Sequence, residues 1–389
     1  MTDIKLKILH IGSDEKFINA ANFIFEEAFP GSNTFIIPHS RFHKKLKYVD
    51  LKKNFELVFF GNNLIKTILK ETLKYDCIVL HGITEINSSV FLQSQEKSKF
   101  IGIIWGAEIY TEENYPGKLL GEKTRSIQLQ VPKQTFIEHV KTIIRRIVYR
   151  RAVTIENASK YAAKSLSYFC GLDDLTKDLL KQKNIIAKDS AYIPFTYYPI
   201  EFVMKGNESA RINGNNILIG NSASNMNNHL EAFHLLKELS TQNRRIIVPL
   251  SYGDKLYADF IQAKGTELFA DCFLPIRHFM PLNEYVKELQ HCGITIMNHY
   301  RSQAVGNILM MLWLGSKVYL NENNTFFQYL KNAGIKVFSI EKELNNTNNS
   351  ALDNLSDMEI EHNRELLIRK IGLKNIVTEL RNGIIKYFS

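Results

Sequence analysis

Short apolar runs alternate along this chain with polar turns and with longer segments of helical periodicity. A short continuous apolar run is typical of a strand buried on both faces, whereas apolar residues at every third or fourth position are typical of a helix packed on one side. Their alternation predicts parallel strands joined by covering helices. We therefore expect an α/β protein.

The apolar runs form two groups, which predicts two sheets. In the first half of the chain the runs cover residues 6–11, 34–37, 57–60, 77–80 and 100–105, and in the second half residues 216–219, 245–249, 266–269, 293–297, 317–320 and 337–339. Each group is typical of a Rossmann-like domain. Ligands of such open sheets bind at the carboxyl ends of the strands, so the loops that follow the runs are the candidate sites.

The domain boundary is expected within residues 194–214, where prolines, tyrosines and small polar residues show no clear period. This predicts an N-terminal domain over 1–195 and a C-terminal domain over 215–389. A length of 389 residues agrees, because it exceeds what one hydrophobic core usually organises. A charged amphipathic helix over 358–388 is expected either to close the second domain or to pack back across the cleft between the domains.

Composition narrows the class of protein. No apolar run approaches the roughly 20 residues that span a bilayer, and the apolar part of the N-terminus is too short for a signal peptide, so we expect a cytoplasmic protein. The four cysteines lie far apart, which favours reduced thiols over a disulfide framework or a zinc site. The formal net charge of +9 favours an acidic partner such as nucleic acid, anionic lipid or a phosphorylated substrate.

Two polar loops of the second half are typical of anion binding. Small residues and side-chain amides, including Gly220, Asn221, Ser222 and Asn227, precede a predicted helix whose N-terminal N–H groups can hold a diphosphate. The alternative is an ordinary helix cap.

The second of these loops follows the run 293–297. Arg301 and Gln303 are expected in the first turn of the next helix, and Gly306 removes a side chain where a ligand can approach the backbone. Capping and close helix packing are the alternative.

Two further loops of the second half are candidates for donor contacts. Tyr252 is placed to stack on a nucleobase beside the turn residue Gly253, or to be a buried structural tyrosine. Asn321 and Asn324 are placed to bind sugar or ribose hydroxyls, or to belong to an ordinary loop.

The loops that follow the apolar runs of the first half are expected at the carboxyl edge of the first sheet. Gly12, Ser13 and Asp14 follow the first run, His81 and Gly82 follow the fourth, and Trp105, Gly106 and Glu108 follow the fifth. The alternatives are structural: Asp14 as a helix cap, His81 as a buried histidine with satisfied hydrogen bonds, and Trp105 as a core residue.

Basic residues concentrate in the segment 117–151, where apolar residues recur at helical spacing from Phe136 with arginines between them. This pattern suits a helix lying on anionic lipid. A helix that packs its apolar face on the core and shows its charges to water is the alternative. Nucleic acid is disfavoured as a partner, because the aromatic residues of a base-stacking surface do not recur there.

Taken together, the segments 10–14, 81–82, 104–110, 218–229, 248–253 and 285–326 resemble one family. It is the 4-acetamido-4,6-dideoxy-D-galactosyltransferases of glycosyltransferase family 56, which use a dTDP-linked donor in the assembly of enterobacterial common antigen. The resemblance implies a GT-B fold, in which two Rossmann-like domains face a central cleft. It implies a dTDP-amino-deoxy sugar donor held by the second domain and a lipid-linked saccharide acceptor held by the first.

Two departures from the family pattern bear on the identity of the donor sugar and the acceptor. The region 119–151 is longer and more basic than in the family, and the cluster 321–326 has Glu322 where the family has a basic residue and Thr325 where it has proline.

The implied reaction assigns a role to each candidate. The amides of 220–222 and 303–306 would hold the diphosphate, with Arg301 countering the charge of the leaving group, and no metal or other cofactor is expected. An acceptor hydroxyl must lose its proton as the new bond forms. Asp14, His81 and Glu108 are the candidate bases, and Gly12, Ser13, Gly82, Trp105 and Gly106 the candidate acceptor contacts.

The resemblance implies that the enzyme is a peripheral protein on the inner face of the bacterial inner membrane. There it would act in common-antigen or O-antigen synthesis. Two other functions fit the same fold. One is a nucleotide-sugar-binding protein without catalysis, and the other is a nucleotide-sugar epimerase.

Overall fold

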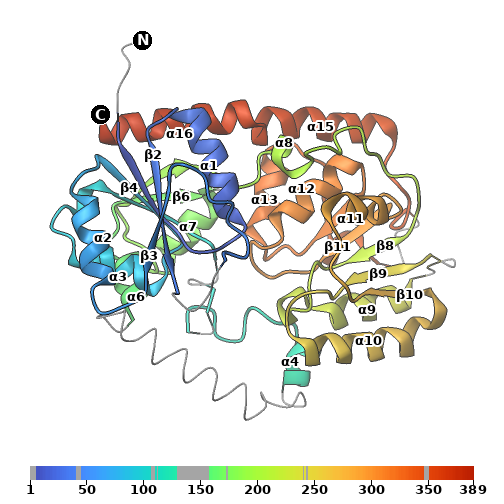
Figure 1. Ribbon diagram of the computed structural model, residues 1–389. Coiled ribbons are helices and arrows are strands. Elements are labelled where there is room, and N and C mark those ends of the chain that lie inside the picture. The colour runs from blue at the N-terminus through green and yellow to red at the C-terminus, as the bar shows by residue number, and fades with distance from the viewer. Residues whose placement is uncertain are drawn as a thin grey trace. The chain divides into compact units, whose positions relative to one another are not determined.

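The computed structural model describes residues 6–40, 45–106, 110–111, 113–128, 157–171, 174–239, 241, 244–345 and 350–389 (Figure 1). The chain divides into two compact units, each built on one parallel sheet. Unit 1 comprises Met1–Asn114, Gln134–Tyr197 and Leu373–Ser389, and unit 2 comprises Tyr115–Lys133 and Tyr198–Gly372. The expected α/β class with two parallel-sheet domains is confirmed.

Unit 1 contains a seven-stranded sheet in the order β3-β2-β1-β4-β5-β6-β7. The strands are β1 (Ile8–Ile11), β2 (Asn33–His39), β3 (Phe55–Phe59), β4 (Cys77–His81), β5 (Phe100–Ile103), β6 (Tyr168–Gly171) and β7 (Ala191–Pro194). Strand order reverses direction at β1, which pairs with β2 on one side and β4 on the other. Such a switch point is where open α/β sheets bind ligands.

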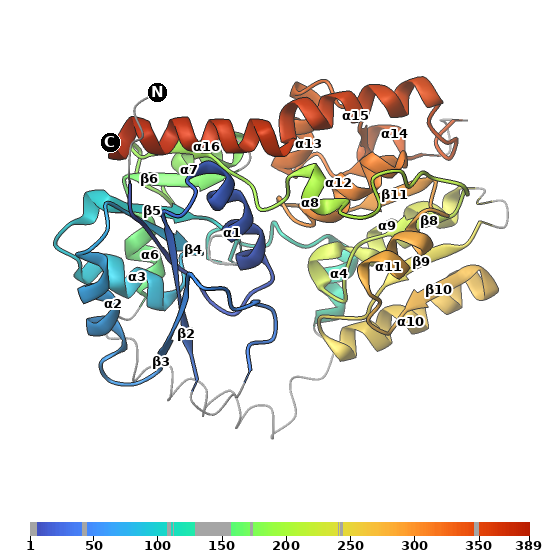
Figure 2. The ribbon, with the colours of Figure 1, turned by 45° about the horizontal axis from the view of Figure 1, so that its top comes forward.

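Helices flank this sheet, and the last of them comes from the end of the chain. They are α1 (Phe17–Ala28), α2 (Leu64–Thr72), α3 (Glu85–Gln93), α6 (Ala158–Ala163), α7 (Asp174–Gln182) and α16 (Leu373–Phe388), with a short η1 (Lys97–Lys99). Helix α16 runs beside α1 in Figures 1 and 2 and also contacts β7. Arg381 donates a hydrogen bond to the carbonyl of Ala28 at 2.6 Å. Residues 373–389 therefore pack in unit 1, whereas the range expected for the second domain extends to residue 389.

Unit 2 contains a six-stranded sheet in the order β10-β9-β8-β11-β12-β13. The strands are β8 (Ile217–Ile219), β9 (Ile246–Pro249), β10 (Phe273–Ile276), β11 (Ile294–Met297), β12 (Lys317–Leu320) and β13 (Phe338–Ser339). Its switch point lies between β8 and β11, which pair directly. The residues of both strands are buried, as expected for central strands of a sheet covered on both faces.

The helices of unit 2 include one that precedes most of the unit in sequence, α4 (Glu122–Gln128). The others are α8 (Ile200–Val203), α9 (His229–Glu238), α10 (Lys255–Phe269), α11 (Leu282–Leu289), α12 (Val305–Leu314), α13 (Thr325–Asn332), α14 (Ile340–Glu343) and α15 (Asp357–Ile371), with the short η2 (Asn225–Asn227) and η3 (Ala270–Cys272). Helix α15 packs on α12.

Three expectations about elements need correction. The strand expected at 266–269 is wrong, because these residues end α10, a helix that begins where Asp254 accepts a hydrogen bond from the backbone N–H of Tyr257 at 2.8 Å. The strand of this region is the edge strand β10, where Pro275 is tolerated. Strands β6 and β7 were not expected. The single helix expected over 358–388 is two helices, divided at Gly372 in extended backbone.

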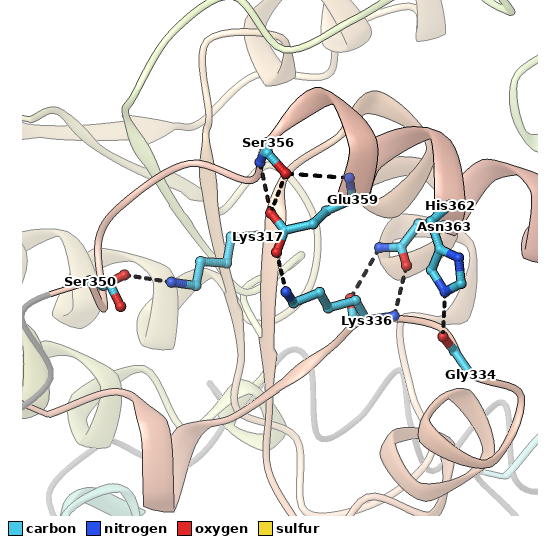
Figure 3. Close-up of polar contacts among 8 residues, drawn as sticks. All are labelled: Lys317, Gly334, Lys336, Ser350, Ser356, Glu359, His362 and Asn363. Atoms are coloured by element: carbon cyan, nitrogen blue, oxygen red, sulfur yellow. Dashed lines mark hydrogen bonds and ion pairs between the residues drawn. The ribbon is translucent and has the colours of Figure 1, made fainter.

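Side-chain hydrogen bonds and an ion pair hold α15 at the edge of the unit 2 sheet (Figure 3). Ser356 and Glu359 form a reciprocal capping box at its first turn, and Glu359 also pairs with Lys336. One turn on, the buried Asn363 accepts a hydrogen bond from the backbone N–H of Lys336 at 2.7 Å and donates one to its carbonyl at 3.1 Å. His362 bonds to the Gly334 carbonyl at 3.1 Å.

Replacing Asn363 with leucine is expected to lower the free energy of unfolding by about 1–3 kcal/mol, because it removes both hydrogen bonds that the buried Asn363 side chain makes with the backbone of Lys336. The exposed neighbour His362 is the matched control, and His362→Ala should cost less than about 1 kcal/mol. Urea denaturation of both variants measures the difference. Equal losses of unfolding free energy in the two variants would contradict the role given to the Asn363 hydrogen bonds.

Candidate functional site

Asn227 organises the loop after β8 from inside. Its side-chain oxygen accepts a hydrogen bond from the backbone N–H of Asn221 at 2.9 Å, and its amide donates to the carbonyls of Ser222 at 3.1 Å and Ser224 at 3.0 Å. Gly220 has a φ of +65°, and a Cβ there would lie 2.6 Å from the Asn227 oxygen. The loop therefore curls around a buried amide, and this curl requires glycine at position 220.

The loop after β9 is joined to the loop after β8. The backbone N–H of Ala223 donates to the Tyr252 carbonyl at 2.8 Å, and the N–H of Asp254 donates to the Ala223 carbonyl at 2.9 Å. Gly253 has a φ of +115°, and a Cβ there would lie 2.5 Å from the Ala223 oxygen. The Tyr252 hydroxyl accepts a hydrogen bond from the Asn221 amide at 3.0 Å while the residue stays 54% exposed. Four of the predicted donor contacts, at positions 221, 222, 252 and 253, are thus brought together.

Asparagines join the loops after β8, β11 and β12. The Asn228 amide donates to the Asn298 carbonyl at 3.0 Å, and the Asn298 amide donates back to the Asn228 carbonyl at 3.4 Å. The Asn321 amide donates to the side-chain oxygen of Asn298 at 3.0 Å. Asn324 caps α13 by accepting from the N–H of Phe326 at 3.0 Å. Asn321 and Asn324, expected to contact sugar hydroxyls, therefore also position the loops.

The loop after β11 continues into α12, which begins at Val305, so Arg301 and Gln303 lie in the loop and the expected place in the first turn of the helix is wrong. Arg301 is half-buried there and donates a long hydrogen bond, 3.4 Å, to the Ser302 carbonyl. A Cβ on Gly306 would lie 3.0 Å from the ring of Tyr198, so a side chain of the protein fills the space that was expected to admit a ligand. Gly306 seats Tyr198 at the start of α12, and its part in donor binding stays a prediction.

Polar atoms without hydrogen-bond partners gather at this edge of the sheet. Among the described residues, buried orphan atoms include Asn221 Oδ1, His229 Nε2, both ring nitrogens of His299, Gln303 Oε1 and Asn324 Nδ2. Each such atom costs about 1–3 kcal/mol when it is left unpaired. Native proteins leave few of them, so their concentration in the loops after β8, β11 and β12 indicates a site for a polar ligand.

Hydrogen bonds join α4 to the start of α9 beside these loops. The N–H of Gly121 donates to the Asn228 side chain at 2.9 Å, and Thr124 donates through its N–H and its hydroxyl to Glu231 at 2.9 and 2.5 Å. A cavity of about 550 Å³ lies here, lined by Thr124, Ile127, Ala223, Ser224, Asn225, Gly253, Asp254 and Tyr257. The beginning of the basic segment 117–151 thus packs on unit 2, and its residues 129–151 lie outside the described residues.

In unit 1, Asp14 holds the loop at 47–49. Its carboxylate accepts hydrogen bonds from the backbone N–H groups of Lys47, Tyr48 and Val49 at 2.6, 2.9 and 3.1 Å. Burial acts to raise the pKa of Asp14, but these bonds outweigh it and the pKa lies below its ordinary value. The next residue, Glu15, has its pKa raised, chiefly by burial. Glu15 was not among the candidate bases predicted from the sequence, and a higher pKa suits a base better than that of Asp14.

His81 lies in a buried chain of hydrogen bonds. Asn33, at one end of this chain, determines which nitrogen of each histidine carries the proton. The Asn33 amide donates to two carbonyls at the end of α1, at 3.1 and 2.8 Å, so its oxygen must accept from His10 Nε2 at 3.1 Å. His10 Nδ1 then accepts from His81 Nε2 at 3.0 Å, and His81 Nδ1 accepts from the Tyr197 hydroxyl at 2.8 Å. Trp105 Nε1 donates to the same hydroxyl at 3.0 Å.

Through this chain of hydrogen bonds His81 positions the Tyr197 hydroxyl, which in turn holds Trp105. The imidazole is fully buried, and burial holds its pKa well below the ordinary value. At the outer end, the half-buried Trp105 and Phe17 and the ring of Tyr197 form an aromatic cluster, with Phe17 5.8 Å from Trp105 between ring centroids. His81 as the base stays a prediction that would require a proton path through Tyr197.

Glycines shape the same edge of unit 1. Gly82 has a φ of +80°, and a Cβ there would lie 2.9 Å from the Trp105 ring. Gly12 is buried against Ile18, whose Cδ1 would lie 2.7 Å from a Cβ at that position. Gly106 has a φ of +95°, and Ser13 is half-buried. The remaining candidate, Glu108, lies outside the described residues.

Buried neutral histidines make the protein sensitive to acid. Burial lowers the pKa values of His10, His229 and His299 to about 3, whereas an unfolded histidine titrates near 6.5. Between these pH values the unfolded chain binds protons that the folded chain does not, so stability is lost as the pH falls below 6.5.

Each of these histidines is expected to contribute up to about 1.4 kcal/mol per pH unit to this loss. Urea denaturation at pH 7.5, 6.5 and 5.5 measures it. The variant His234→Gln, at an exposed position of α9, should retain the wild-type slope. A free energy of unfolding that is unchanged down to pH 5.5 would contradict the prediction.

Two negative findings concern the described residues alone. No three of their His, Cys, Asp or Glu side chains are grouped so as to hold a metal ion, and metal-independent transfer stays a prediction. No helix in this part of the chain has the length and apolar character needed to span a bilayer. The four cysteines are free, as their spacing indicated.

Solved structures share this fold over nearly the whole chain. Anabaena HepE, in complex with UDP and glucose, aligns with a TM-score of 0.63 and 11% identity over 98% of this chain and 100% of its own. A glycosyltransferase from Rickettsia africae gives a TM-score of 0.60 and 14% identity over 99% and 98%. Sucrose-phosphate synthase from Thermosynechococcus elongatus gives 0.64 and 8% over 98% and 99%. These similarities define the fold as that of the GT-B glycosyltransferases.

The family described as 4-alpha-L-fucosyltransferase glycosyl transferase group 56 matches residues 161–361, just over half of the chain. The chain belongs to this family, as its resemblance indicated, and it is a glycosyltransferase. The matched region includes β7, all of the unit 2 sheet and the loops that carry the predicted donor contacts.

Proposed function

We propose that this enzyme transfers a 4-acetamido-4,6-dideoxyhexose from a dTDP-sugar to a lipid-diphosphate-linked saccharide in bacterial envelope polysaccharide synthesis, of the common-antigen or O-antigen type. The observation that carries the proposal is the group of buried polar atoms at the carboxyl edge of the unit 2 sheet that have no hydrogen-bond partner in the described part of the chain. Membership of glycosyl transferase group 56 supports it.

The donor is assigned to unit 2. In the loop at 220–222 the N–H groups of Gly220 and Asn221 donate within the protein, so that loop contributes its shape and its side chains. The start of α12 offers backbone N–H groups beside Arg301, and Tyr252 offers an exposed ring for the base. Groups of this kind stabilise the charge that grows on a departing diphosphate. The UDP and glucose in the HepE structure agree with a nucleotide-sugar donor.

The acceptor is assigned to unit 1. Phe17 and Trp105, half-buried beside the buried Tyr197, are aromatic rings of the kind that pack on sugar rings. The basic segment 117–151 is proposed to bind anionic lipid and so to hold the enzyme peripherally at the inner membrane, where a lipid-linked acceptor resides.

Glu15 is proposed as the group that takes the acceptor proton, in place of its neighbour Asp14. Glu15→Gln is expected to lower kcat by about 100-fold or more with little change in donor KM or in stability. Asp14→Asn should mainly destabilise the protein, because an amide cannot accept its three backbone bonds equally well. Steady-state kinetics and urea denaturation separate the two. Full activity of Glu15→Gln would refute the assignment.

The proposed function is tested by incubating the protein with dTDP-, UDP- and GDP-hexoses and their acetamido-dideoxy forms, with and without a lipid-diphosphate-linked saccharide in anionic vesicles. The expected result is release of dTDP and a glycolipid heavier by one residue, both dependent on the acceptor. Binding without any turnover would overturn the proposal in favour of a non-catalytic protein. Conversion of the nucleotide sugar to its epimer without an acceptor would overturn it in favour of an epimerase.

A further inference from the structure

Two fully buried histidines lie beneath the loops assigned to the donor. His229 opens α9, and a Cβ on Gly220 would lie 2.9 Å from its Nε2. His299 follows β11 by two residues, and β11 pairs with β8 so that the N–H of Gly220 donates to the Ile296 carbonyl at 3.0 Å. The paired Asn228 and Asn298, each one residue before a histidine, fix this arrangement.

Neither imidazole has its hydrogen-bonding capacity filled. His229 Nδ1 lies 3.0 Å from the Tyr257 hydroxyl, while its Nε2 has no partner among the described residues. Both nitrogens of His299 lack one as well. A histidine that served only to fill the core would be replaced at less cost by an apolar residue, because an unpaired buried nitrogen is unfavourable. The pair therefore requires another explanation.

The charged groups around the pair explain why it is neutral without a ligand. Burial is the largest cause of the low pKa of His299, and the positive charge of Arg301 and the nearness of His229 lower it further. From another element, the Tyr257 hydroxyl on α10 faces His229 Nδ1. Glu231, on α9 like His229, interacts with Tyr257, and its carboxylate already accepts two hydrogen bonds from Thr124.

We infer that the His229–His299 pair takes up a proton when the diphosphate of the donor binds on the loops above it. This inference rests on the proposed donor site. A doubly negative group within about 6 Å raises the pKa of an imidazole by about two to four units at the effective dielectric of proteins. It also offsets the charge of Arg301. The proton comes from solvent, and the imidazolium then faces the diphosphate from the protein side, so both histidines act as positioning residues.

The test is calorimetric titration of the full-length protein with dTDP-glucose and UDP-glucose. Esterified diphosphates are suitable probes, because a terminal phosphate would itself titrate near pH 6. Titrations in two non-phosphate buffers of different ionisation enthalpy, at pH 6.5, 7.5 and 8.5, give the number of protons bound with the ligand. We expect a substantial fraction of a proton at pH 6.5, close to none at pH 8.5, and an affinity that is severalfold tighter at the lower pH.

Variants then identify the group that is protonated. His299→Gln and His229→Gln should lower the proton uptake and flatten the pH dependence of affinity, whereas His234→Gln on the exposed side of α9 should change neither. If a buried variant fails to fold, the wild-type titration still decides the question. Binding without proton uptake at any of these pH values would overturn the inference and leave the proposed function standing. Absence of both binding and transfer for every nucleotide sugar would overturn the two together.

Discussion

Gly220→Ala is expected to lower the free energy of unfolding by about 2–4 kcal/mol and to weaken nucleotide-sugar binding by at least about tenfold. Part of the loss comes from placing a side chain at a φ of +65°. The rest comes from contact, because the new Cβ would meet Asn227 Oδ1 at 2.6 Å and His229 Nε2 at 2.9 Å. Moving Asn227 releases the loop that it holds from inside, so Asn221 no longer places its amide against the Tyr252 hydroxyl.

Gly206→Ala is the matched control. Gly206 also belongs to unit 2 and has a φ of +77°, but no atom of the described residues lies within 4 Å of a Cβ there. This variant should show the backbone cost alone, about 1 kcal/mol, with unchanged affinity. Urea denaturation and calorimetric titration of both variants provide the comparison. If both lose affinity equally, the contact with Asn227 does not hold the donor loop.

His81→Phe is expected to cost about 3 kcal/mol or more of stability, because it deprives His10 of its donor and Tyr197 of its acceptor within a fully buried chain. Activity should also fall through a higher acceptor KM, since Tyr197 then no longer fixes the indole of Trp105.

A double-mutant cycle with His10→Phe distinguishes the chain from simple packing. The double variant should lose clearly less stability than the sum of the single losses, because each single change leaves a partner unsatisfied that the double change removes. Thermal or urea denaturation of the four proteins measures the coupling. Additive losses, together with an unchanged acceptor KM in His81→Phe, would show that the two imidazoles act independently.

Much of the fold could be predicted from the sequence because the central strands are short apolar runs buried on both faces. Residues 8–11, 217–219 and 294–297 are clear examples. Strands β6 and β7 escaped prediction because several of their residues are partly exposed, unlike those of the central strands. The strand predicted at 266–269 is the apolar end of α10. In the fold Phe273 packs over Gly265 of this helix, and that contact cannot be recognised in the sequence.

The loops of the candidate site could be proposed from sequence, but the contacts of their residues could not. Glycines after strands indicated these loops, whereas the structure shows internal contacts at them: Asn227 lies against Gly220 and Tyr198 against Gly306. The buried histidines had a weaker signal, a titratable residue inside or just after an apolar run, as at His10 and His299. Their importance depends on which atoms lack partners, and such information exists only in three dimensions.

The closing helix has a consequence for synthesis of the protein. Helix α16 buries Ile376, Leu380 and Ile384 in the unit that also contains the first strand, and its Gly383 lies against Ile193 of β7. During translation the sheet of unit 1 emerges before the sheet of unit 2, but α16 emerges only after residue 372, when unit 2 is complete. Until α16 has been made, that apolar face of unit 1 stays open to chaperones, and a premature stop within α16 would destabilise unit 1 more than unit 2.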